Sequence, residues 1–374
     1  MATPESVRRR KRRFIGLIVL LVALAGGWSA FWFYAASQAQ QQIAGWRARE
    51  AKAGRIYTCG RQTLAGFPFR IEVDCTPAAA HFKSGGVAMD VETKRALVVA
   101  QIYSRNLLIA EITGPLTVAE DGKAPELVAN WKQAYSSVGG NPLAPQRVAI
   151  VFDNPTLARA GGGSQETLLT ADHMELHGRI VGGSVWHKPV IELALSMKQA
   201  AMPAVRLAKA APVDGEIVAT LHGLDDFTPK PWPARYREIQ KNGGYIEITR
   251  ARLVQGQTLA VGAGKLSLTP DGYLQGKLNV TAAGLEHFLN AIGASMAVQK
   301  SPEMDKVAGF LDKLSPGLGD VARKQVGAHL SFGVKAIEGD AKLEGKPAVS
   351  LPLTFDHGAV SLGPIPLGQT PKLF

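Results

Sequence analysis

An uninterrupted apolar run near the N-terminus constrains this chain more than any other feature. Residues 14–36 hold 23 consecutive residues without a charge, FIGLIVLLVALAGGWSAFWFYAA. As a helix with a rise of about 1.5 Å per residue, the run extends about 35 Å, enough to cross the hydrocarbon layer of a bilayer with some tilt. No charged residue follows until Arg47. The sequence therefore predicts a transmembrane anchor over residues 14–36.

Charged and aromatic residues at the two ends of this run predict its orientation. Residues 8–13 are all basic and directly precede the run. Because basic flanks stay on the cytoplasmic side, we expect residues 1–13 in the cytoplasm and residues 37–374 outside it. Aromatic residues crowd positions 28–34, where amphipathic rings favour the headgroup region.

A cleaved signal peptide is the alternative interpretation of the same segment. Its apolar core spans about 7–15 residues and ends at a cleavage site of small residues. Residues 37–39 (Ser-Gln-Ala) loosely resemble such a site, but the apolar core here is longer and bulky aromatic residues precede the site. The anchor is the favoured interpretation, and cleavage stays open.

The chain has a net charge of +11, from 42 basic and 31 acidic residues in 374. The positions of the basic residues argue against nucleic-acid binding. Six of the basic residues belong to the N-terminal block, and the rest of the chain is only mildly basic. Sequence-independent nucleic-acid binding requires a dense basic stripe, and none follows Arg13. We therefore expect no nucleic-acid partner.

Two cysteines, Cys59 and Cys75, stand 16 positions apart and are the only ones in the chain. If the body is exported to an oxidising compartment, a close lone pair favours a disulfide. Closing a loop of this size contributes about 3 kcal/mol in the chain-entropy model. Two buried free thiols are the alternative.

Residues 66–75 (GFPFRIEVDC) alternate with a period of two, which is typical of a half-buried strand. Phe67, Phe69 and Ile71 fall on one face together with Val73 and Cys75. A first or edge strand that closes a core explains this pattern. A second hypothesis is that Phe67, Phe69 and Ile71 line an apolar groove.

The segments GWRARE (45–50), GRIYTC (54–59) and GFPFRIE (66–72), followed by Cys75, resemble the signature of a bacterial envelope family, domain of unknown function 2125. LGPIPLG at 362–368 is similar to the ending of that family. The resemblance implies a bacterial inner-membrane anchor, a periplasmic body and no catalytic residues to transfer. The Gly-Phe-Pro-Phe element is also similar to one in envelope families whose long, curved β-sheets are thought to hold lipid, a fold-level analogy.

Short apolar or alternating runs bounded by Gly, Pro and Asn predict a mainly β fold of the α+β class, with a large curved antiparallel sheet and a few short helices. The Pro residues between 212 and 245 are compatible with a domain boundary there, and one continuous sheet is the alternative. The expected strands are 95–103, 107–112, 116–119, 148–152, 190–197, 215–221, 245–254, 259–268, 273–280, 329–337, 349–355 and 359–362. The expected helices are 37–53, 125–137, 233–241, 285–292 and 302–314.

Catalytic motifs are absent from the sequence, which contains no GxSxG, phosphate loop or HExxH. His173, Glu175 and His177 would share one face of a strand and supply three zinc ligands, but same-face side chains about 7 Å apart fit poorly around one ion. The solvated face of an amphipathic strand is the favoured interpretation. We therefore expect no enzyme activity, cofactor or metal.

These features predict a non-enzymatic, single-pass periplasmic protein whose β-sheet binds lipid or a lipid-linked molecule in an apolar groove. The alternative is an envelope scaffold that binds other proteins through sheet edges or the helix expected at 125–137. Oligomeric state and ligand identity do not follow from the sequence.

Overall fold

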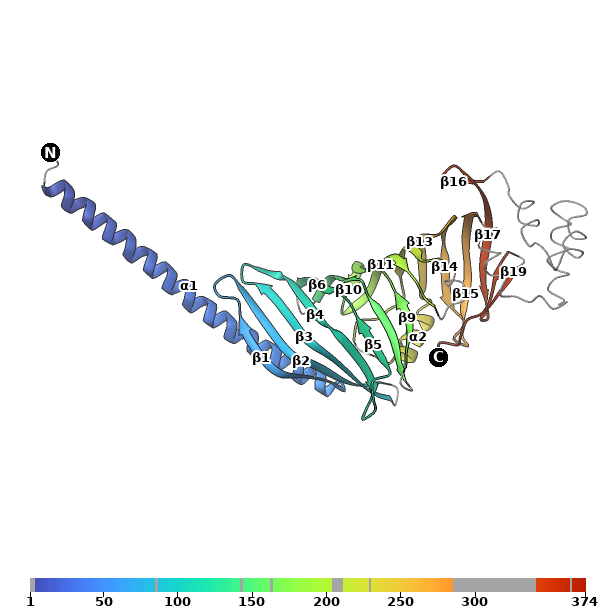
Figure 1. The fold of residues 1–374 in the computed structure, drawn as a ribbon, viewed down its shortest axis with the longest axis horizontal. Helices are drawn as coiled ribbons and strands as arrows, with labels where there is room; N and C mark the ends of the chain where they lie inside the picture. Colours follow the sequence, from blue (N-terminus) through green and yellow to red (C-terminus); the bar gives the residue numbers. More distant parts are fainter. Residues whose placement is uncertain are drawn as a thin grey trace, which may run out of the picture.

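One long helix and one long antiparallel sheet make up the computed structural model (Figure 1). It describes residues 4–84, 87–141, 144–161, 164–203, 211–228, 230–284, 341–363 and 365–374. The helices expected at 285–292 and 302–314 and the strand expected at 329–337 lie outside these residues. The expected antiparallel β fold is confirmed.

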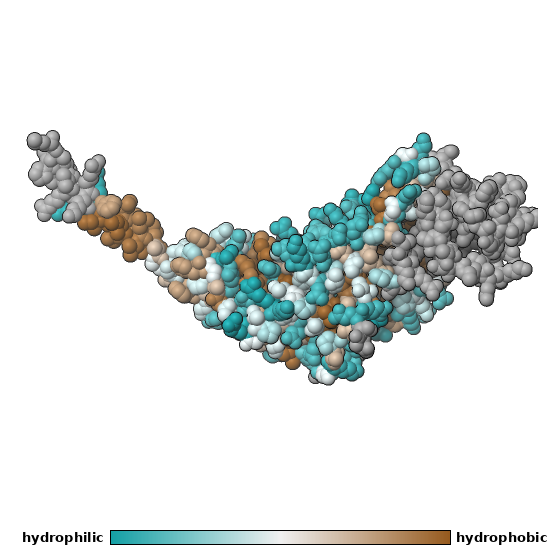
Figure 2. Space-filling model, viewed as in Figure 1, coloured by the Kyte–Doolittle hydropathy of each residue, from teal (hydrophilic) through white to brown (hydrophobic). Residues whose placement is uncertain are grey.

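Helix α1 (Pro4–Lys52) contains both the predicted span and the polar helix expected after it, in one continuous element of 49 residues. It is long and apolar enough to span a membrane, and its apolar stretch is not buried in the protein. Figure 2 shows that stretch standing clear of the body. The C-terminal half of α1 instead packs on the first strands of the sheet.

Nineteen strands follow within the described residues, and every pairing between them is antiparallel. The first half of the sheet consists of Arg55–Ala65 (β1), Arg70–Ser84 (β2), Val87–Gln101 (β3), Ser104–Glu120 (β4), Leu127–Asn130 (β5), Gln133–Asn141 (β6), Ala144–Asp153 (β7), Thr156–Gly161 (β8), Ser164–Thr170 (β9) and His173–Ser184 (β10). The second half consists of His187–Ala200 (β11), Val213–Leu221 (β12), Tyr245–Gln255 (β13), Thr258–Leu268 (β14), Leu274–Ala283 (β15), Lys342–Leu343 (β16), Lys346–Asp356 (β17), Ala359–Leu362 (β18) and Ile365–Gln369 (β19).

The strand order is a meander with one fork. Strand β4 pairs with β6 through residues 107–111 and with β5 through residues 116–118, so the sheet divides there. One branch runs through β6 and β7 to β10, and the other runs through β5 and β8 to β9. A bridge between Thr170 and Ala201 rejoins the branches. From β10 onward the neighbours follow the sequence through β15 and β17 to β19, so strand pairing continues across the boundary considered at 212–245.

The helix predicted at 125–137 is wrong, because this segment forms β5 and β6. Leu127, Trp131 and Tyr135 recur every four residues, as on a helix. In the structure they lie in β5, in the connection between β5 and β6, and in β6. Leu127 pairs with Val118, and Tyr135 pairs with Glu111. Trp131 lies between the strands and donates its indole N–H to the carbonyl of Ile112 at 2.7 Å. Pairing with β4 therefore overrides the local helical pattern.

Helix α2 (Trp232–Lys241) confirms the helix predicted at 233–241, with a proline in its first turn. Residues 269–272 (Thr-Pro-Asp-Gly), a combination typical of hairpin turns, form the turn between β14 and β15. Thr269 accepts from Gly272 N–H and its hydroxyl accepts from Tyr273 N–H. Gly272 has a φ of +85°, a conformation that disfavours residues with a side chain.

Two clusters of buried hydrophobic side chains lie at the two ends of the sheet. Trp32 and Ala36 of α1 pack with Ile102, Leu64 and Ile71 at the N-terminal end. At the C-terminal end, β14, β15, β17 and β18 form a second cluster. Its members are Ala260, Val280, Ala282, Val349, Leu351, Leu353 and Leu362.

Candidate functional site

A continuous apolar surface runs along one face of the sheet, and we call it the apolar face. Directly paired residues share a face, so the strand registers trace it from strand to strand. One row crosses the sheet without a polar side chain, from Ile71 near α1 to Leu362 near the C-terminus. It consists of Ile71, Ala100, Leu108, Val138, Val148, Gly178, Leu193, Ala219, Ile248, Gly264, Leu278, Leu353 and Leu362.

A second row beside the first has a single polar member, Ser136. It consists of Leu64, Val73, Val98, Ala110, Ser136, Ile150, Leu176, Leu195, Ile217, Ala251, Gly262, Val280 and Leu351. Leu64 and Ile71, where the rows begin, both pack against Trp32 and Ala36 of α1. The apolar face therefore starts beneath the helix that fits a membrane anchor and ends in the C-terminal cluster.

The opposite face of the sheet, which we call the polar face, carries the ion pairs, together with apolar side chains such as Val99 and Ile109 on β3 and β4. Arg179 and Glu192 pair across β10 and β11 at 2.7 Å. Arg252 pairs with Glu344 at 3.0 Å. Arg179, Glu192 and Arg252 alternate along β10, β11 and β13 with members of the apolar face, so the two faces differ in polarity on these strands.

Between its two ends, the apolar face is only half covered. Leu176 and Leu253 are each 42% exposed, whereas Leu351 in the C-terminal cluster is 8% exposed. An apolar side chain exposed to this degree contributes less to stability than one in a closed core. The middle of this face is therefore a surface on which an apolar ligand can be accommodated.

Helix α2 and the loop before it cover part of the apolar face and enclose a pocket of about 470 Å³. Sheet residues Leu221, Ile246 and Leu266 form its floor, since they are paired with one another on the apolar face. Phe227 and Trp232 line it from the other side. Lys230 and Arg235 also line it, and both are ion-paired with Glu238. A volume of this size falls within the range of small-ligand pockets.

The three residues of the predicted groove occupy two different settings. Ile71 lies in β2 with Val73 and Cys75 as expected, and it begins a row of the apolar face. Phe67 and Phe69 do not belong to the strand, because β2 begins at Arg70 and residues 66–69 form the β1–β2 turn. Their rings contact aromatic side chains of α1, which lies about 40 residues earlier in the chain.

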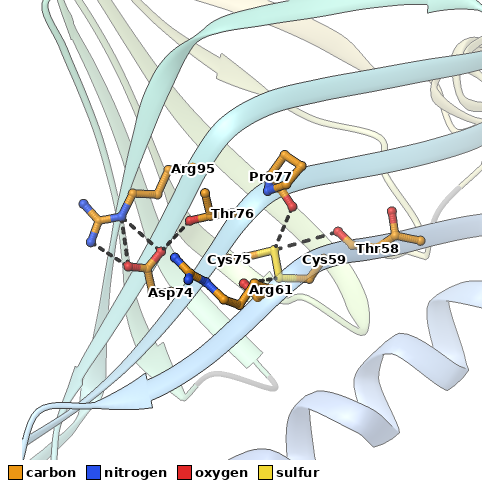
Figure 3. Close-up of a disulfide and its surroundings, with 8 residues drawn as sticks. All are labelled: Thr58, Cys59, Arg61, Asp74, Cys75, Thr76, Pro77 and Arg95. Carbon is orange, nitrogen blue, oxygen red and sulfur yellow. Dashed lines mark hydrogen bonds and ion pairs between the residues drawn. A yellow bond between two sulfur atoms is a disulfide. The ribbon is translucent and has the colours of Figure 1, made fainter.

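The structure pairs Cys59 with Cys75 across β1 and β2, with a Cα–Cα distance of 5.4 Å (Figure 3). Beside the disulfide, Arg95 donates to both carboxylate oxygens of Asp74 from the next strand. Hydrogen bonding from the Arg95 guanidinium lowers the pKa of the Asp74 carboxyl. A disulfide is typical of an oxidising compartment.

The histidine set predicted on one strand face forms an ion-paired chain. Glu175 bonds His173 at 2.7 Å and His177 at 2.8 Å, and His173 also bonds Asp153 at 2.6 Å. Hydrogen bonds to Glu175 and then Asp153 raise the pKa of His173, and those to His173 and His177 lower the pKa of Glu175. The carboxylate lies between the imidazoles, so the set is satisfied as salt bridges on the polar face.

A second group with possible metal ligands was not predicted from the sequence. His81, Asp90 and Asp121 each place a ligand atom within 4.8 Å of the others. Asp90 already bonds His81 at 2.8 Å, and Asp121 is exposed. Because the residues come from three separate strand ends, no local spacing signals this group.

The fold and these surfaces define an open antiparallel β-sheet protein with one apolar face, attached to an N-terminal helix that fits a membrane anchor. Residues 32–371 match a family described as an uncharacterized protein conserved in bacteria (DUF2125). The chain therefore belongs to the DUF2125 family, as the motifs at residues 45–75 and 362–368 predicted. No curated protein matches the chain.

Proposed function

We propose that this protein is a membrane-anchored, non-enzymatic lipid-binding protein whose apolar face holds the acyl chains of a lipid or lipid-linked molecule. The single observation behind this proposal is the row from Ile71 to Leu362, which crosses the sheet without a polar side chain. The main path from β1 to β19 holds fifteen strands, and a spacing of about 4.8 Å per strand gives a path of about 70 Å.

The chemistry of the proposed ligand follows from the place where the two rows of the apolar face begin. Both rows begin against α1, whose apolar stretch is long enough to lie in a bilayer. Acyl chains are the apolar molecules present at that position. The pocket under α2, which Phe227 and Trp232 line opposite the sheet, suits the end of such a chain.

The basic N-terminus and the disulfide support an orientation with residues 1–13 in the cytoplasm and the sheet in the periplasm. Alkaline phosphatase, which is active only outside the cytoplasm, serves as the reporter when fused after Phe374. We expect an active fusion, and an inactive one of full length would contradict this orientation.

Photocrosslinking tests occupancy of the apolar face in intact cells. The photoreactive residue p-benzoylphenylalanine replaces Leu176 or Leu253 on the apolar face, and Arg179 or Arg250 on the polar face of the same strands serves as the matched control. We expect phospholipid adducts by mass spectrometry at Leu176 and Leu253, with at least a fivefold excess over the controls. Equal adduct yields on both faces, or none on the apolar face, would contradict the proposal. Protein adducts at Leu176 in place of lipid would favour the scaffold alternative, whose predicted helix at 125–137 is not formed.

A further inference from the structure

The two turns nearest α1 form a compact aromatic tip, which we call the membrane-proximal tip. It consists of Gly66–Phe69 between β1 and β2, and Ile102–Tyr103 between β3 and β4. The amide of Ile102 donates to the carbonyl of Phe69 at 3.1 Å, which joins the two turns. In Figure 1 these hairpins end where the free part of α1 leaves the sheet.

This tip contacts α1 within the predicted span. The ring of Phe69 lies 6.2 Å from that of Trp28, and the ring of Phe67 lies 5.6 Å from that of Trp32. A helix that starts to cross at Phe14 needs about 20 residues for a hydrocarbon layer of about 30 Å, so its crossing ends near residue 33. The contacts at Trp28 and Trp32 therefore lie at or just inside the boundary of that layer.

Three carbonyl groups of the tip, those of Gly66, Pro68 and Phe69, accept hydrogen bonds within the protein, which suits a low-polarity environment. The indole N–H of Trp28 donates to the carbonyl of Pro68 at 2.8 Å, and that of Trp32 donates to the carbonyl of Arg70 at 2.9 Å. The carbonyl of Gly66 accepts from the Arg70 amide at 3.0 Å. Pro68 has no N–H to satisfy.

The side chains of the tip remain open despite these contacts. Phe69 is 61% exposed and Tyr103 is 70% exposed, and both project from turns, which are usually polar in water-facing proteins. Aromatic rings with an apolar body favour the membrane interface. Internally bonded carbonyls and outward aromatic rings at the depth of the bilayer boundary point to one partner, the lipid surface.

We propose that the membrane-proximal tip is embedded in the interfacial layer of the membrane beside α1. The sheet then has a second point of attachment, which fixes its direction relative to the bilayer. The apolar face opens directly onto lipid, because Leu64 and Ile71 adjoin the tip. Embedding does not depend on lipid occupying the apolar face farther along the sheet.

The full-length protein in nanodiscs of phosphatidylcholine and phosphatidylglycerol tests this proposal. Here p-benzoylphenylalanine replaces Phe69 or Tyr103, and the control is Trp186, which is 63% exposed but lies far along the chain, in the turn between β10 and β11. Thiol labelling of the unreduced protein checks that each variant retains its disulfide.

We expect lipid adducts at Phe69 and Tyr103 with at least a fivefold excess over Trp186. Adduct yields at the tip no higher than at Trp186 would overturn the proposal. Adducts at Phe69 and Tyr103 without adducts at Leu176 would support the embedded tip and contradict the proposed lipid-binding function, so the two failures are distinguishable.

Discussion

Replacing one leucine by alanine at two places on the apolar face separates a ligand surface from a structural core. Leu351 is 8% exposed and packs in the C-terminal cluster, so its removal deletes buried methyl groups and leaves a cavity. We expect Leu351→Ala to lower the free energy of unfolding by about 3 kcal/mol. Leu176 is 42% exposed, so only a little more than half of its side chain is buried. Because full burial of a leucine contributes about 2 kcal/mol, we expect Leu176→Ala to lower the free energy of unfolding by about 1 kcal/mol and to leave no enclosed cavity.

Urea titration of the full-length protein in detergent micelles, followed by circular dichroism of the sheet, measures both losses. Arg179→Ala on the polar face is the control, and its exposed ion pair predicts a change below about 1 kcal/mol. The difference of about 2 kcal/mol between the two leucine variants is the tested quantity. If Leu176→Ala destabilises the protein as much as Leu351→Ala, the middle of the apolar face is a packed core and the reasoning is refuted.

Three further predictions concern the disulfide, the histidine chain and one turn. Replacing both Cys59 and Cys75 by serine should lower the free energy of unfolding by about 3 kcal/mol in urea titration, and an unchanged midpoint would contradict the link between β1 and β2. The raised pKa of His173 means that its ion pairs stabilise the fold fully below about pH 6.5, the ordinary pKa of histidine, and that this contribution is lost as the pH rises through the folded pKa. The difference in urea midpoint between wild type and His173→Gln should therefore shrink between pH 6 and pH 9, and a constant difference would refute this. Gly272→Ala should cost about 1–2 kcal/mol, because φ is +85° and the new Cβ would lie 2.6 Å from the Phe374 carbonyl, and thermal unfolding measures it.

Local patterns predicted much of the fold because antiparallel strands carry a signal with a period of two. The runs at 190–197 and 245–254 alternate clearly, and both are strands. Pro270, Asp271 and Gly272 marked a turn because each favours a turn conformation. The segment at 125–137 misled because the spacing of its apolar residues fits a helix, and only pairing with β4 shows otherwise.

The candidate site was harder to predict because it depends on contacts between distant residues. Each strand shows its own apolar side, but the continuity from Ile71 to Leu362 requires the register of every pair. The role of Phe67 and Phe69 depends on Trp28 and Trp32, about 40 residues earlier. No local period reports such a contact.

The meander has a consequence for how this architecture can vary in length. From β10 onward the strands pair mainly with their immediate neighbours, so a hairpin is a removable unit. Deleting two consecutive strands keeps the alternating strand direction and leaves each remaining side chain on its original face. It shortens the sheet by about 10 Å. The reach of the molecule away from its anchor is thus adjustable in hairpin-sized steps without a new core.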